Sequence, residues 1–302
     1  MAAQIAWIGL GNMGRGLAKN LAVNESLTSP LVIYNRTLSR AESFASQNAN
    51  TVVASTISEV LSKADVIFTC VGDDAAIQKM IGSCIAAGNI KDKLFIDCST
   101  VHPDTTSLIA AKIEDAGGNF VASPVFGAPA MAEAGQVICV LAGPKDAVDK
   151  AKEYTAAFSK GCIDFSGQDP AKASLLKIMG NTFVLRMVEA IAEGLVVAEK
   201  SGLGTDSLHQ FFETVFPGPY VAYSARMRSG DYYQREEPLF AVGLARKDAR
   251  HALGIAEQAG AKMRGVELAD RYLAEVQEMG ARGDLASMYG VIRREAGLSY
   301  EN

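Results

Sequence analysis

Residues 5–21 read IAWIGLGNMGRGLAKNL, and this segment determines which fold the sequence predicts. The run begins as a short apolar strand, continues with three glycines spaced G-x-G-x-x-G, and ends as an amphipathic helix. The first glycine permits a tight turn, the second lets the backbone approach a pyrophosphate, and the third lets the helix lie close to the strand. Because a helix N-terminus attracts anions, we expect this turn to hold a dinucleotide through Gly9, Leu10, Gly11, Asn12, Met13 and Gly14.

Apolar strands alternate with helices through the first half of the chain. Strand-like runs follow at residues 31–34, 51–53, 66–69 and 94–97, and helical segments separate them. This alternation predicts an α/β fold with a Rossmann-type, doubly wound parallel sheet, whose ligands bind at the carboxyl ends of the strands. Two of these strands are followed by Val71, Gly72, Ser99 and Thr100. Further strands are expected at 119–122, 137–141 and 162–165, with a loop at 123–129 and a helix at 145–158.

The second half of the chain is helical in pattern. Residues 171–200 contain no proline and predict one long helix, and further helices are expected at 205–215, 241–259, 266–279 and 288–296, with a Pro/Gly break at 217–219. A helix that is apolar on more than one face is usually buried on several sides. We therefore predict a dinucleotide-binding domain at 1–167, an interdomain helix at 168–200 and an all-helical domain at 201–302.

The second strand ends at Asn35-Arg36-Thr37, where an NAD-preferring site would place a carboxylate on the ribose 2′-hydroxyl. This chain has no carboxylate there. Arg36 can pair with a 2′-phosphate, and Asn35 and Thr37 can add hydrogen bonds. The position predicts NADP (NADPH) as cofactor; the alternative is a solvated arginine in a loop.

Lys177 is the candidate catalytic residue. It lies in an apolar run, and Asn181 follows one helical turn later on the same face. Apolar surroundings disfavour the charged form of a lysine and lower its pKa toward the range useful for proton transfer. A carbonyl oxygen that gains or loses a proton during hydride transfer needs such a partner. The alternative is a surface lysine whose stem lies along apolar neighbours.

Composition narrows the classes of partner. The 302 residues are 49% hydrophobic and 21% charged with a net charge of −5, which argues against nucleic acid. The longest apolar region, 175–197, is interrupted by four charged residues, so no membrane association is expected. The five cysteines have no C-x-x-C spacing and the three histidines are scattered, so we expect no disulfide and no metal site. The first strand begins near Met1, and together with the cysteine content this predicts a cytoplasmic protein.

Several motifs in order resemble the β-hydroxyacid dehydrogenase family, which includes 3-hydroxyisobutyrate dehydrogenase, the glyoxylate/succinic semialdehyde reductases and, more distantly, 6-phosphogluconate dehydrogenase. The resemblance covers nearly the whole length. It rests on the glycine turn, on Asp97-Cys98-Ser99-Thr100, on Lys177 with Asn181, on Ala192-Glu193-Gly194-Leu195, and on Phe240 with Leu244, Lys247 and Asp248. The compact helical C-terminal domain and assembly into homodimers or homotetramers are also implied.

The resemblance further implies a role for individual residues. Lys177 would be the catalytic acid/base and Asn181 would support the substrate. Ser99 and Thr100 would lie at the substrate carboxylate and the nicotinamide. Lys247 would reach the cofactor, and Phe240 and Asp248 would close the pocket.

One loop departs from the family pattern. Where the family usually has Ser-Gly-Gly, whose serine and glycines bind the substrate carboxylate, this chain has Phe126, Gly127 and Ala128. The departure implies that carboxylate binding is weakened, is moved to backbone N–H groups, or is replaced by contacts to a more apolar substrate.

The sequence therefore predicts an NADP-dependent dehydrogenase or reductase that acts on a small hydroxy acid, keto acid or aldehyde. One alternative is an imine reductase-like enzyme, although such relatives usually lack the lysine. The other is a non-catalytic NADP-binding scaffold, against which Lys177 and Asn181 argue.

Overall fold

The computed structural model describes residues 3–24, 27–280 and 283–302. The chain divides into two compact units, Met1–Lys177 and Ile178–Asn302. The longest helix, α8 (Ala171–Ser201), crosses the division, and it corresponds to the long helix expected at 171–200.

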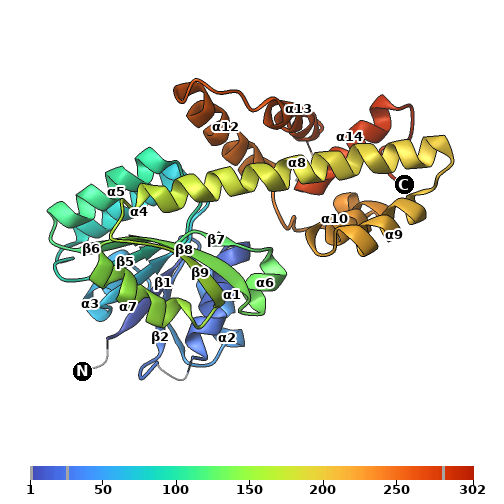
Figure 1. Ribbon diagram of the computed structural model, residues 1–302. Coiled ribbons are helices and arrows are strands. Elements are labelled where there is room, and N and C mark those ends of the chain that lie inside the picture. The colour runs from blue at the N-terminus through green and yellow to red at the C-terminus, as the bar shows by residue number, and fades with distance from the viewer. Residues whose placement is uncertain (1–2, 25–26, 281–282) are drawn as a thin grey trace. The chain divides into compact units, whose positions relative to one another are not determined.

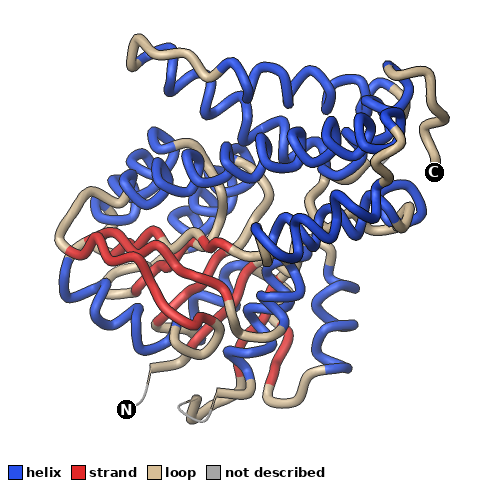
Figure 2. The backbone as a smooth tube through the Cα atoms, turned by 45° about the vertical axis from the view of Figure 1, so that its right-hand side comes forward, coloured by secondary structure: helices blue, strands red, loops and turns tan. Residues whose placement is uncertain are grey.

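In the described residues, the first unit contains a nine-stranded sheet (Figures 1 and 2). Its parallel part has the order β3-β2-β1-β4-β5-β6, which confirms the predicted Rossmann-type arrangement. The strands are β1 (Ile5–Ile8), β2 (Leu31–Tyr34), β3 (Thr51–Val53), β4 (Val66–Thr69), β5 (Leu94–Asp97) and β6 (Asn119–Ala122). The strand order reverses between β1 and β4, and ligands of open α/β sheets bind at such a point.

Side chains of β1 alternate between two apolar clusters, because successive residues of a strand point to opposite faces. Trp7 lies in the cluster covered by α1 (Asn12–Ala22), α2 (Leu38–Gln47) and α7 (Lys145–Thr155). Ile8 lies in the cluster covered by α3 (Ile57–Lys63), α4 (Asp74–Ala87) and α5 (Pro103–Asp115). Figure 1 shows helices on both faces of the sheet. Burial on both faces explains why these strands are continuously apolar.

The last strands extend the sheet by another pattern. β8 (Val137–Gly143) runs antiparallel to β6 and to β7 (Val125–Phe126), whereas β9 (Ser159–Ser166) runs parallel to β8. The prediction of a loop over 123–129 was wrong. Val125 and Phe126 pair with Cys139 and Ile138, and α6 (Pro129–Glu133) begins directly afterwards. A two-residue strand has no periodicity to detect, and it forms because β8 supplies a partner.

The second unit is helical, as predicted. The described elements after α8 are α9 (Thr205–Val215), α10 (Pro219–Arg228), α11 (Asp231–Gln234), α12 (Val242–Gln258), α13 (Arg264–Glu278), the short 3-10 helix η1 (Leu285–Ser287) and α14 (Met288–Glu295). Its core includes Leu195 of α8, Leu273 of α13 and Ile292 of α14. Helix α10 begins at the predicted Pro/Gly break and α11 follows α10, and neither helix was expected from the sequence. Pro219 occupies the first turn of α10, where its missing N–H costs nothing.

Candidate active site

The three glycines of the first turn have distinct surroundings in the structure. Gly9 has φ of 102°, and a Cβ there would collide with the carbonyl oxygen of Cys70. A Cβ on Gly14 would collide with the carbonyl oxygen of Gly9. A Cβ on Gly11 would meet nothing within 4 Å. Gly9 and Gly14 are therefore required by the fold, whereas Gly11 keeps space open beside the start of α1.

This open space fits the diphosphate of a dinucleotide. Gly11 is the N-cap of α1 and has no side chain to cover the first-turn amides, and the sequence of that turn contains no carboxylate. A helix start of this kind favours an anion through its N–H groups and its dipole. Leu10, Asn12 and Met13 lie in the same turn, at the carboxyl end of β1.

The end of β2 is tied to the glycine turn. The side-chain oxygen of Asn35 accepts a hydrogen bond from the backbone N–H of Leu10 (3.1 Å), and its amide nitrogen donates to the carbonyl oxygen of Thr37 (3.0 Å). Arg36 and Thr37 are exposed next to it. Asn35 therefore shapes the turn, and the guanidinium of Arg36 is exposed beside it.

A buried carboxylate joins the loops after β4 and β5. Asp97 accepts hydrogen bonds from the hydroxyl of Thr69 (2.6 Å) and from the hydroxyl and backbone N–H of Ser99 (2.7 and 3.2 Å). The Ser99 hydroxyl also accepts from the backbone N–H of Val71 (2.9 Å), and Ser99 is only 2% exposed. Ser99 thus donates its one hydroxyl proton to Asp97. Val71 and Gly72 follow β4, and Thr100 follows Ser99 at the same edge.

No role for Asp97 was expected from the sequence, although it lies in the motif Asp97-Cys98-Ser99-Thr100. An acidic residue at the end of an otherwise apolar strand could have indicated a role, since a buried carboxylate needs hydrogen-bond partners. Asp97 positions Ser99, and through it the backbone of Val71.

Lys177 is the last residue of the first unit and is 8% exposed. Its Nζ lies 4.6 Å from the centroid of the Phe126 ring, which is a cation–π geometry. Burial raises the pKa of the nearby Cys70 thiol to about 12, the charge of Asp97 raises it as well, and the positive charge of Lys177 opposes them. The charge of Lys177 therefore acts on Cys70, the residue that follows β4 at the carboxyl edge of the sheet.

Asn181, Phe240, Lys247 and Asp248 belong to the second unit, whereas the predicted substrate-binding residues Gly127 and Ala128 lie in the first unit, between β7 and α6. The side-chain amide of Asn181 donates to a carboxylate oxygen of Asp248 (2.7 Å), and both side chains are buried. The Nζ of Lys247 lies 3.3 Å from the other oxygen of Asp248. Phe240 is half-buried just before α12, and its backbone N–H donates to Asp284. Asn181, Lys247 and Asp248 thus form one polar group within this unit.

The structure gives the histidines local structural partners. His102 is the N-cap of α5, and its ring accepts from the backbone N–H of Asp104. His209 pairs with the hydroxyl of Ser224. Across residues 3–24, 27–280 and 283–302, no group of three or more His, Cys, Asp and Glu side chains is arranged to hold a metal ion.

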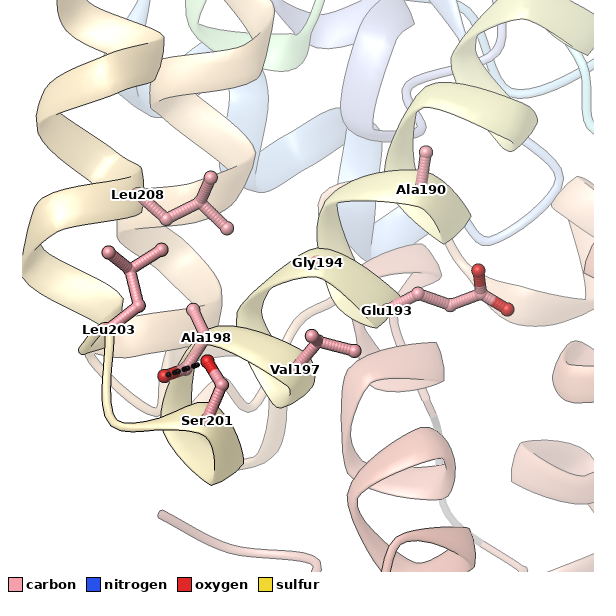
Figure 3. Close-up of a pocket in the computed structure, with 8 residues that line it drawn as sticks. All are labelled: Ala190, Glu193, Gly194, Val197, Ala198, Ser201, Leu203 and Leu208. Carbon is pink, nitrogen blue, oxygen red and sulfur yellow. Dashed lines mark hydrogen bonds between the residues drawn. The ribbon is translucent and has the colours of Figure 1, made fainter.

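A shallow pocket of about 400 Å³ lies elsewhere, on the second unit (Figure 3). Its lining is mostly apolar and comes from the C-terminal half of α8 and the start of α9: Ala190, Glu193, Gly194, Val197, Ala198, Ser201, Leu203 and Leu208. None of the predicted site residues lines it. Among the described helices, none combines the length and the apolar character needed to cross a bilayer.

Two family models together match most of the chain. The model described as the NAD binding domain of 6-phosphogluconate dehydrogenase matches residues 4–167. The model described as NAD-binding of NADP-dependent 3-hydroxyisobutyrate dehydrogenase matches residues 171–292. The two matches meet close to the division between the structural units.

Individual relatives are similar over nearly their whole length. The NADH-dependent oxidoreductase ucdB of Aspergillus ustus is 33% identical, over 95% of this chain and 98% of the relative. Glyoxylate/succinic semialdehyde reductase 1 of Arabidopsis thaliana is 27% identical, over 93% of this chain and 95% of the relative. The structure of Mycobacterium tuberculosis 3-hydroxyisobutyrate dehydrogenase with L-serine superimposes with a TM-score of 0.79 at 22% identity, over 97% of this chain and 100% of that one.

Proposed function

The chain belongs to the β-hydroxyacid dehydrogenase family and is an NAD(P)-dependent oxidoreductase of the 3-hydroxyisobutyrate dehydrogenase type, and within that family we propose a specific reaction. The proposed enzyme interconverts a small aldehyde, keto acid or ketone with the corresponding alcohol or hydroxy acid. The proposed cofactor is NADP(H), and the proposed general acid/base is Lys177.

When bound, the reduced nicotinamide cofactor supplies the hydride that the carbonyl carbon gains. The C=O electron pair then moves onto oxygen, and the Lys177 ammonium donates a proton to that oxygen. The products are the alcohol and the oxidised cofactor, and the amine regains its proton from solvent. In the opposite direction, the neutral amine of Lys177 removes the hydroxyl proton.

The observation that carries this proposal is the position of Lys177 in the first unit. The side chain is nearly buried, with its Nζ over the Phe126 ring, and its charge acts on Cys70, which follows β4 at the same sheet edge as the glycine turn. A lysine that only snorkels along a helix surface would keep its ammonium in water. Asn181 follows one turn later in α8 and is the proposed support for the substrate. The proposal also includes the roles that the family resemblance implies for other residues. Thr100 lies at the substrate carboxylate and the nicotinamide, Lys247 reaches the cofactor, and Phe240 and Asp248 close the pocket.

The test replaces Lys177 with alanine. Lys177→Ala should lose about 10²–10⁴-fold in kcat for carbonyl reduction, the usual contribution of general acid–base catalysis. Binding of NADPH, followed by its fluorescence, should change little. Lys172→Ala is the matched control, because Lys172 is exposed on the same helix. Unchanged turnover in Lys177→Ala would remove the mechanism.

The preference for NADP over NAD rests on Arg36. Its exposed guanidinium follows β2, where a carboxylate would favour NAD. The matched family model for the second half is named for an NADP-dependent enzyme, whereas the 33% identical relative is named as NADH-dependent. The ratio of the kcat/KM values for NADPH and NADH therefore measures which cofactor this chain prefers.

Self-association into a homodimer or homotetramer is also part of the proposal. Phe183 and Val197 on α8 are 77% and 64% exposed, which is unusual for large apolar side chains. Sedimentation or light scattering would give the subunit number, and Phe183→Gln is expected to weaken the assembly. A cytoplasmic location, expected from the cysteine content, is tested by cell fractionation.

A further inference from the structure

Phe126 stands at the position where the family pattern has the carboxylate-binding serine. Its backbone is held in β7 by pairing with Ile138 of β8, and its ring packs against the apolar cluster on the α3–α5 side of the sheet. Lys177 Nζ lies over that ring at 4.6 Å from the centroid. The ring is thus held in place from the sheet, and the lysine is held against it from α8.

We propose that Phe126 makes this site selective for carbonyl substrates that carry no carboxylate, and that its ring face keeps Lys177 in the ammonium form needed for reduction. The inference rests on the proposed function and narrows it. Of the aldehydes, ketones and keto acids considered above, it selects uncharged aldehydes and ketones with an apolar substituent.

The first argument concerns donors of hydrogen bonds. A carboxylate that leaves water needs N–H or O–H groups to replace its hydration. Phe126 offers none, and Ser99 already donates its hydroxyl proton to Asp97. Ala128 adds a methyl group where the family keeps a glycine. The side chains of Ser99 and Phe126 therefore provide no proton for a hydrogen bond to a substrate carboxylate.

The second argument concerns charge on the lysine. The face of an aromatic ring carries the negative part of its quadrupole, so it attracts an ammonium ion and not a neutral amine. The same face repels a carboxylate placed on it. The ring therefore favours the form of Lys177 that donates a proton to a carbonyl oxygen, and it disfavours an anion in the same place.

The test compares succinic semialdehyde with its methyl ester, which removes the negative charge and adds one methyl group. The wild-type chain should reduce the ester with a kcat/KM at least about tenfold above that for the acid. Phe126→Ser, which restores a hydroxyl, should shift this ratio toward the acid by about 10–100-fold. A wild-type preference for the acid, or an unchanged ratio in Phe126→Ser, would overturn the inference.

Two further variants separate the two arguments. Phe126→Leu keeps an apolar side chain without a π face, so it should keep the preference for the ester. Its reduction rate should decline at a lower pH than that of the wild-type chain, because the ammonium form is less favoured. Phe126→Tyr keeps the ring and should restore the wild-type pH profile. Identical pH profiles for all three chains would contradict the role of the ring.

A binding measurement distinguishes failure of the inference from failure of the proposed function. Isobutyramide and isobutyrate are unreactive and nearly isosteric, and calorimetry with the NADP-loaded chain compares their affinities. The amide should bind more tightly to the wild-type chain, and Phe126→Ser should reduce that difference. If no carbonyl compound is reduced although NADPH binds, the proposed function fails and calorimetry still decides the selectivity. If the acid is the better substrate, the selectivity fails and the dehydrogenase reaction stands.

Discussion

The hydroxyl of Thr69 lies 2.6 Å from the same carboxylate oxygen of Asp97 that accepts from Ser99. All three side chains are buried, so this carboxylate links the ends of β4 and β5 without contact with water. Removing it would leave two hydroxyl groups without their acceptor. The loops that carry Val71, Ser99 and Thr100 depend on this arrangement.

Asp97→Ala is therefore expected to lower the free energy of unfolding by about 2–4 kcal/mol, since each buried hydroxyl left unpaired costs roughly 1–3 kcal/mol. Urea denaturation measures the change. Thr69→Val is the matched control, because it removes one donor and leaves the bonds from Ser99; a loss of about 1 kcal/mol is expected. Equal stability of Asp97→Ala and wild type would show that the buried carboxylate costs as much as its bonds return.

Two alanine substitutions in the glycine turn should have opposite consequences. Gly9→Ala places a methyl group against the carbonyl of Cys70 at a positive φ, and it should lower stability by about 1–3 kcal/mol. Gly11→Ala meets no protein atom, so the melting temperature should change little, whereas dinucleotide affinity should fall about tenfold or more. Thermal denaturation and NADPH fluorescence measure the two effects. Unimpaired NADPH binding by Gly11→Ala would place the diphosphate elsewhere.

Arg36→Asp should reverse the preference between cofactors. It replaces the cation proposed to face a 2′-phosphate with a carboxylate that can accept from a ribose hydroxyl. We expect kcat/KM for NADPH to fall about 10–100-fold, with that for NADH unchanged or raised. Arg40→Ala, an exposed arginine on α2, is the control and should change neither value. Equal losses for both cofactors would point to a damaged turn.

Glu189 on α8 should make stability depend on pH. Burial, the charge of Glu193 and a hydrogen bond with Glu193 together raise the pKa of Glu189 to about 7, against the opposing charge of Arg186. The unfolded chain releases this proton near the ordinary value of 4.5. Between those values the folded chain binds more protons than the unfolded chain, so stability falls as pH rises through this window.

The expected loss between pH 4.5 and pH 8 from this group is roughly 1–3 kcal/mol. Glu189→Gln should flatten that part of the stability profile and be more stable than wild type at pH 8. Denaturation curves at several pH values provide the comparison. The opposite slope, with wild type gaining stability through this window relative to the variant, would contradict the assignment.

The cysteines should react selectively. All five are reduced thiols, and Cys162 on β9 is the exposed one. Burial raises the pKa of Cys70 and Cys84 to about 12 and that of Cys139 to about 11, and it raises the pKa of Cys98 as well. Only the thiolate reacts with a disulfide reagent. The native chain should therefore show one fast thiol, absent in Cys162→Ser, and five after unfolding.

The sequence alone determined the elements whose signals are local. The glycine turn, the apolar strands β1 to β6 and the long helix α8 follow from the spacing and periodicity of neighbouring residues, because such patterns reflect backbone geometry and one-sided or two-sided burial. These local patterns were sufficient to predict the Rossmann-type sheet, the edge of that sheet at which ligands bind, and Lys177 as the candidate catalytic residue. The roles of Lys177, Asn181 and the cofactor-binding residues stay predictions, which substitutions such as Lys177→Ala and Gly11→Ala test.

The tertiary structure decided what depends on residues distant in sequence. Phe126 is a strand residue because β8 pairs with it, and its ring contacts Lys177 because β7 and the first residues of α8, 171–177, both belong to the first unit. The hydroxyl of Ser99 donates a hydrogen bond to Asp97, and the side-chain oxygen of Asn35 accepts one from the backbone N–H of Leu10 in the glycine turn. A single hydrogen bond or ring contact of this kind leaves no periodic pattern in the chain, since it depends on which strands and helices pack side by side.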